Sequence, residues 1–100
     1  MMRPRGPARI PPSPNPDEFC LRIGQAIVAD PALLKVASVE GNNLVIIELS
    51  APSDEIGRVV GRDGRTIFAI RTLAEALGVR INKRIVVDAQ VASRPGNMRS

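Results

Sequence analysis

Residues 56–71, IGRVVGRDGRTIFAIR, decide how this chain folds. Gly61 and Gly64 stand three positions apart and permit a tight turn, because glycine adopts backbone conformations that are closed to other residues. A short helix that begins near Asp54 is predicted before the turn. A longer helix is predicted after it, with Gly78 as its C-cap. The stretch is therefore interpreted as a helix, a Gly-x-x-Gly turn and a second helix.

The longer helix is expected to be apolar on one face. Residues three and four positions apart share a helix face, and those predicted to face the core are Ile67, Ile70, Leu73, Ala74 and Leu77. Phe68 falls on roughly the opposite face, beside the small residues Thr72 and Ala76. A phenylalanine among small outward-facing residues is a candidate for a dimer interface. The alternative is that a neighbouring loop or an arm residue covers Phe68.

The sequence before the turn predicts a helix followed by a β-hairpin. Asn15 has the chemistry of an N-cap, Pro16 suits the first helical position, and Glu18 completes a capping box. The half-polar run 35–40 is expected to form an edge strand. The nearly apolar run 44–49 is expected to form a central strand.

A last apolar run, 85–89, predicts the third strand and gives the element order α-β-β-α-α-β. Crossover connections within one sheet are right-handed and join parallel strands, so this strand should lie parallel to 44–49. The ordered domain is expected to span residues 15–90. A disordered, basic, proline-rich arm is predicted at 1–14, either without a specific role or helping to hold a polyanion, and a frayed tail at 91–100.

Charge is unevenly distributed over the 100 residues. The formal charge is +4, but residues 1–16 carry +3, residues 91–100 carry +2, and residues 17–90 carry −1. A uniformly basic nucleic-acid binder is therefore excluded. The central region nevertheless concentrates positive charge at the turn, where four arginines and one aspartate give +3 (Arg58, Arg62, Arg65 and Arg71 against Asp63).

Missing residue types exclude most enzyme chemistry. The chain has no His, Trp or Tyr and a single cysteine, Cys20. Histidine-based catalysis and the usual zinc sites need residues that are not there, so we expect neither an enzyme nor a metal or cofactor. Cys20 is expected to be a buried thiol. A lone cysteine and the lack of a membrane span or signal peptide favour a cytoplasmic protein.

The turn has the features of a phosphate-binding site. A helix that begins directly after a Gly-x-x-Gly string directs unpaired N–H groups and the positive end of its dipole toward a ligand above the turn. Arginines add charge at the same place. A Gly-x-x-Gly string alone is a weak signal, and a tight corner between two helices is the alternative.

The string VVGRDGRTI, together with the element order, resembles type II KH domains. The longer match through Ala69, Ile70, Arg71 and Thr72 is similar to the family of small bacterial single-KH RNA-binding proteins of the KhpA type, over about residues 16–90. This resemblance implies an α+β fold with helices on one face of a three-stranded mixed sheet. It also implies a groove for about four unpaired nucleotides, whose backbone the turn clamps.

The resemblance implies roles for individual residues. The clamp would be Gly61, Arg62, Asp63 and Gly64, with Arg58 and Arg65 adding contacts to phosphate. Val60, Ile67 and strand residues near 44–46 are candidates for the groove floor. The carboxylate of Asp63 should moderate affinity, so micromolar-class binding is expected. Only two aromatic residues are present, which disfavours RNA-binding modules that stack bases on aromatic rings.

The sequence leaves several hypotheses open for the biological role. The resemblance implies single-stranded RNA as the partner, in RNA chaperone activity or post-transcriptional regulation, and it implies a homodimer and a larger KH/R3H-type partner protein. A KH fold that serves mainly for protein interaction or dimerisation is the second hypothesis. A ribosome-associated assembly factor is a further one.

Overall fold

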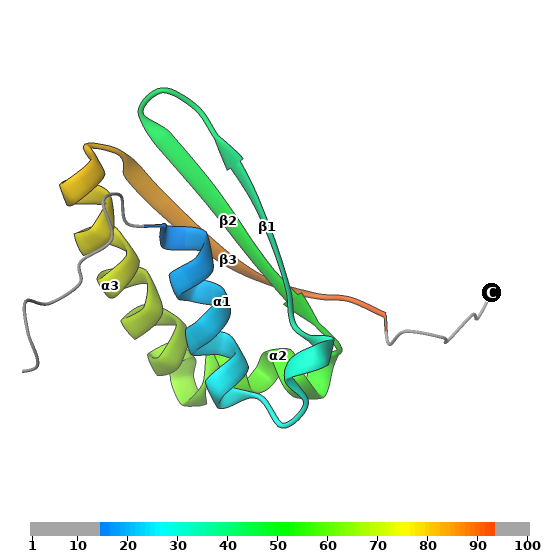
Figure 1. Ribbon diagram of the computed structural model, residues 1–100. Coiled ribbons are helices and arrows are strands. Elements are labelled where there is room, and N and C mark those ends of the chain that lie inside the picture. Colours follow the sequence, from blue (N-terminus) through cyan, green and yellow to red (C-terminus); the bar gives the residue numbers. More distant parts are fainter. Residues whose placement is uncertain (1–14, 94–100) are drawn as a thin grey trace, which may run out of the picture.

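Three helices cover one face of a three-stranded sheet in the computed structural model, which describes residues 15–93 (Figure 1). In chain order the main elements are α1 (Pro16–Ile27), β1 (Lys35–Glu40), β2 (Leu44–Ala51), α2 (Ser53–Val60), α3 (Arg65–Ile81) and β3 (Arg84–Val91). Short 3₁₀ turns, η1 (Pro31–Leu33) and η2 (Arg62–Gly64), follow α1 and α2. The predicted order and the α+β class are confirmed. The predicted arm and the segment from residue 94 onward lie outside the described residues.

The sheet has the strand order β1-β2-β3. β1 pairs antiparallel with β2, and β2 pairs parallel with β3, so that Leu44 lies opposite Arg84 and Ala51 opposite Val91. The hairpin and the parallel crossover are therefore as predicted. β2 and β3 each run two residues further than the sequence indicated, and Val91 is thus part of a strand rather than of a tail. β3 forms one edge of the sheet, a position that matters for the site below.

The core lies between the sheet and the helices. Alternate residues of β2 and β3 point inward, because side chains of a strand alternate between its two faces, and the central ones are Ile47, Leu49 and Val87. The helices contribute Cys20, Val59, Ile67, Ile70 and Ala74 to the same cluster. Leu73 is not among them, since half of its surface is exposed. Consecutive helical residues are about 100° apart, which turns Leu73 away from the direction of its buried neighbour Ala74.

The helix ends differ in detail from the predictions. Asn15 and Pro16 occupy the predicted N-cap and first helical positions of α1, but Asn15 makes no side-chain capping bond. Instead the carboxylate of Asp17 accepts the N–H of Glu18 at 2.9 Å, so no capping box forms. α2 begins at Ser53, one residue earlier than expected.

At the end of α3, Gly78 is not a cap. The helix continues to Ile81 and is capped by Asn82, which has a φ of 61°. Gly78 is buried against the carbonyl oxygen of Lys83 and the side chain of Ile85, and a Cβ at this position would collide with both. The glycine therefore allows the start of β3 to approach α3. Within residues 15–93, no helix combines the length and apolar character needed to cross a bilayer.

Candidate nucleic-acid interface

The turn between α2 and α3 has an unusual backbone. Gly61 and Gly64 have φ values of 79° and 74°, and Asp63 between them has a φ of 57°. Glycine adopts such values freely, and aspartate is one of the few other residues that tolerate them. A Cβ on Gly61 would also collide with the side chain of Thr66. The two glycines and the aspartate thus fit the conformation that this turn requires.

Hydrogen bonds fix the turn from within. The N–H of Gly61 donates to the carbonyl of Gly57 at 2.9 Å, and the N–H of Gly64 donates to the carbonyl of Gly61 at 3.1 Å. The two glycine amides are therefore satisfied inside the chain. The N–H of Arg65, the first residue of α3, donates to the carbonyl of Arg62, and no side chain caps the helix. The N–H groups that follow in the first turn have no partner within the helix and face the space beside the turn. This leaves a site that favours negative charge.

The arginines at the turn differ in how firmly they are held. Arg58 lies with its Nε 3.6 Å from Oε1 of Glu55. Glu55 is itself buried and accepts hydrogen bonds from the N–H groups of Ala29 and Asp30 at 2.8 and 2.9 Å. In contrast, Arg62 and Arg65 are exposed and make no ion pair with any residue of the described range 15–93. Their charge is available to a ligand.

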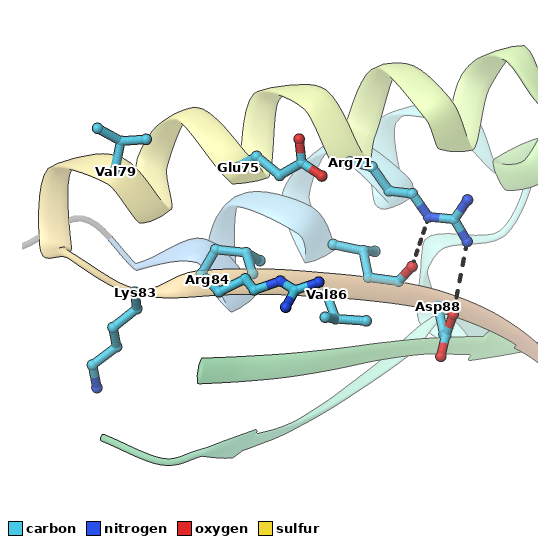
Figure 2. A pocket seen from close by; sticks show the side chains of 9 residues that line it. Arg71, Glu75, Val79, Lys83, Arg84, Val86 and Asp88 are labelled. Carbon is cyan, nitrogen blue, oxygen red and sulfur yellow. Dashed lines mark hydrogen bonds and ion pairs between the residues drawn. The ribbon is translucent and has the colours of Figure 1, made fainter. Parts of the chain in front are cut away.

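Arg71 does not lie at the turn, although its charge counts toward the cluster in the sequence. Its side chain crosses from α3 to β3, where Nε donates to the carbonyl oxygen of Val87 at 2.8 Å. Nη2 lies 3.7 Å from Oδ1 of Asp88 (Figure 2). Arg71 therefore bridges the helix and the edge strand of the sheet.

A groove of about 410 Å³ runs between α3 and β3. Its lining comes from α3, from β3 and from the short connection between them: Arg71, Glu75, Val79, Lys83, Arg84, Ile85, Val86, Val87 and Asp88. The residues expected from the sequence to form the floor of the RNA groove do not line this cavity, and their role stays a prediction. Ile67 is buried in the core, Val60 is half-buried, and Ile46 points to the sheet face opposite the helices.

The sequence contained one signal for this groove that was not used. Arg71, Glu75 and Val79 recur every fourth residue along α3 and thus share one side of the helix. Which strand this side faces depends on the strand order of the sheet. That order places β3, and not β2, at the edge beside α3.

The outer face of α3 is open. Phe68 is 68% exposed, Val79 is 81% exposed, and Thr72 and Ala76 lie exposed on the same helix. The hydroxyl of Thr72 donates to the carbonyl of Phe68 at 3.0 Å, which keeps the polar group against the helix backbone. No loop within the described part of the chain covers Phe68. An interface role for this face stays a prediction.

Cys20 has the buried position expected of it. Its side chain is fully enclosed in the core, and burial, with a smaller contribution from Asp17, raises the pKa of the thiol to about 11. A thiol reacts as the thiolate, so Cys20 is protonated and unreactive near neutral pH. Among residues 15–93, no group of three Cys, Asp or Glu side chains is placed to hold a metal ion.

Comparison with known proteins agrees with this geometry. A family model for the KH domain of KhpA and KhpB matches residues 17–89. The chain belongs to this family. It is 35% identical over 71 residues to the RNA-binding protein KhpA of Caldanaerobacter subterraneus subsp. tengcongensis, covering 71% of this chain and 95% of the relative. It is 38% identical over 66 residues to KhpA of Clostridium acetobutylicum, covering 66% and 88%. KhpA of Chlamydia pneumoniae is 37% identical over 71 residues, covering 71% and 91%.

Proposed function

We propose that this chain binds single-stranded RNA and acts by binding, without enzymatic chemistry. The observation that supports this most strongly is the turn Gly61–Gly64 of a KhpA/KhpB-type KH domain. A helix without a side-chain cap follows it, and Arg62 and Arg65 make no ion pair within residues 15–93. Several relatives carry the name RNA-binding protein. KH domains hold about four nucleotides by their backbone at such a turn.

In this binding mode, the residues of the turn have different roles. Gly61 and Gly64 provide the backbone shape, and the N–H groups of Arg62 and Asp63, between them, donate to a phosphate. The side chains of Arg62 and Arg65 neutralise phosphate charge, with Arg58 contributing less because it is drawn toward Glu55. The exposed carboxylate of Asp63 repels phosphate. Binding by a single domain is therefore micromolar-class.

A charge reversal at Arg62 tests the site. We expect Arg62→Asp to remove most binding to a fluorescein-labelled hexauridylate, measured by fluorescence anisotropy, because it places a second carboxylate in the clamp. The thermal melt followed by circular dichroism should stay nearly unchanged, since Arg62 is exposed. The matched control is Arg80→Asp, which makes the same charge change in the last turn of α3, away from the turn. Undiminished affinity in Arg62→Asp would place the RNA site elsewhere.

Salt gives a second measurement on the same samples. Neutralisation of phosphates releases counterions, so affinity should fall steeply as salt rises. Arg62→Asp should flatten this dependence, while the control variant should keep it.

The exposed face of α3 favours a second component of the function, assembly. We propose a homodimer formed through Phe68, Thr72 and Ala76, and a further association with a larger KH/R3H-type RNA-binding protein. RNA chaperone activity or post-transcriptional regulation in the cytoplasm would follow from a dimer that presents two RNA sites. Assembly as the main role, with weak RNA binding, is the alternative that this face supports.

A further inference from the structure

The groove between α3 and β3 contains a pair of opposite charges. Arg71 comes from α3 and Asp88 from β3, and their side chains meet in the groove (Figure 2). The floor along β3 is apolar at Ile85 and Val86. Such a groove suits a flat ligand with an apolar face and a polar edge, which is the description of a nucleobase.

Arg71 is held in one position before any ligand arrives. Its Nε donates to the carbonyl of Val87, which is a backbone acceptor on the open edge of the sheet. The guanidinium has five N–H donors in a fixed plane, and only one of them is used in this bond. The remaining donors lie next to the carboxylate of Asp88, whose oxygens can accept about four hydrogen bonds. The pair thus offers donors and acceptors side by side.

We infer that Arg71 and Asp88 together recognise a guanine base; this rests on the proposed function. A carboxylate accepts two parallel hydrogen bonds only from an edge with two adjacent donors. Guanine has such an edge, N1–H beside N2–H₂, with the acceptor O6 next to it for the arginine. Adenine, cytosine and uracil place an acceptor beside their donor on this edge, so that an oxygen of Asp88 would face a lone pair.

The position of the pair fits a nucleotide next to the clamped backbone. Arg71 follows Gly64 by seven residues, which corresponds to about 10 Å along the axis of α3. A strand of four nucleotides that starts at the turn and follows α3 therefore passes the pair. The clamp would supply affinity without regard to sequence, and the groove would supply the preference for guanine at one position.

Single-base substitutions in an RNA probe test this inference. The probes are fluorescein-labelled hexauridylates in which each position in turn carries G, A or C, measured by anisotropy at one salt concentration. We expect guanine at one position to bind about tenfold more tightly than adenine there, the size of one good bidentate base contact. Asp88→Asn should reduce this preference to within about twofold, because the amide offers one acceptor instead of two. Arg71→Lys should do the same, because the fork is lost.

Glu75→Gln is the matched control. It removes one negative charge from the same groove, as Asp88→Asn does, and leaves the pair intact. Both variants should bind uridylate slightly better, and only Asp88→Asn should lose the guanine preference. Equal binding of all four bases at every position would overturn the inference, as would a preference that survives Asp88→Asn. If such probes still lose affinity in Arg62→Asp, the proposed function stands. If no probe binds the unmodified protein, the proposed function fails instead.

Discussion

Asp63 is placed by backbone conformation at a point where its charge opposes the ligand. Its φ of 57° is one that aspartate and asparagine tolerate and that most side chains avoid. Its carboxylate is exposed beside the groups proposed to bind phosphate. Asparagine tolerates the same φ but carries no charge, so a substitution by asparagine separates the effect of the charge from that of the backbone conformation.

We therefore expect Asp63→Asn to tighten RNA binding by about fivefold, equivalent to the removal of one repulsion of roughly 1 kcal/mol at the surface. The melting temperature should stay the same. Asp63→Ala is the control for conformation: it also lacks the charge, but alanine tolerates a positive φ less well, so its melting temperature should fall. Anisotropy titrations and thermal melts of both variants measure these effects. Weaker binding by Asp63→Asn would show that the carboxylate contributes to the site.

The sequence predicted the residues of the turn but not its internal geometry. Sequence reasoning could identify Gly61, Gly64 and the arginines. Two glycines three positions apart indicate a tight turn, and the arginines beside them concentrate positive charge at it. The left-handed conformation of Asp63 and the contact of Arg58 with Glu55 depend on neighbours distant in the sequence. Local pattern carries no information about such contacts.

At the scale of the element, α3 serves three different neighbours. Its first turn adjoins the Gly61–Gly64 turn, its inner face packs on the core, and one side forms a wall of the groove. Helical periodicity predicted the inner face well for Ile67, Ile70 and Ala74. It was wrong for Leu73, which is half exposed. Periodicity gives the direction of a side chain, but it does not show how far the packed core extends around the helix.

Gly78 shows the same dependence on a distant neighbour. A glycine near the end of a helical pattern predicts a cap, whereas here it creates space for the backbone at Lys83. We expect Gly78→Ala to lower the free energy of unfolding by about 1–3 kcal/mol, the usual cost of overpacking, as measured by urea denaturation.

Gly57→Ala is the control for this substitution. Gly57 lies inside α2, and a Cβ there would have no atom within 4 Å. Alanine is the better helix former, so the free energy of unfolding of this variant should rise by about 0.5–1 kcal/mol. Equal stability of the two variants would contradict the close approach of α3 and β3.

At the scale of the whole molecule, the exposed face of α3 sets the expected oligomeric state. A domain of this size has a small core, and it leaves Phe68 and Val79 largely in contact with water. Burial against a second copy would contribute about 2 kcal/mol for each phenylalanine. A two-fold axis beside Phe68 would bring the small side chains of Thr72 and Ala76 together, which lets two helices approach closely.

We expect Phe68→Asp to be monomeric by light scattering, with an unchanged circular dichroism spectrum because the side chain makes no contribution to the core. The unmodified protein should be mainly dimeric at ~100 μM. This requires more than about 5.5 kcal/mol, so the contacts of Thr72, Ala76 and Val79 must add to those of the two phenylalanines. The variant should lose more affinity for long RNA than for a tetranucleotide, since two linked sites gain from effective concentration. A monomeric unmodified protein at this concentration would exclude the interface. Thr66→Asp is unsuitable as a control because Thr66 packs beneath Gly61. Arg80→Asp is the better one, because Arg80 is exposed on α3 and lies outside both the groove and the proposed interface.

The overall fold was more predictable than the groove. Element order, strand pairing and the parallel crossover follow from alternation, periodicity and the handedness of connections, which are properties of local sequence and general geometry. The groove requires knowledge of which strand lies beside α3 and how far each strand extends. Those facts arise from the pairing of Leu44 with Arg84 and of Ala51 with Val91, which no single segment specifies.

Because β2 pairs with β3, the sheet cannot be completed during synthesis until β3 has been made. β3 leaves the ribosome after every element that it packs against, because it is the last of the described strands. Until then β2 has an unpaired edge, and Ile47 and Leu49 lack the cover of Ile85 and Val87. The hydrogen bond that joins the hairpin loop to the start of β3, from the N–H of Arg84 to the carbonyl of Asn43, is equally absent. A nascent chain that already displays the Gly61–Gly64 turn therefore does not yet have the finished sheet beneath it, and we expect it to retain RNA firmly only after residues 84–91 are released.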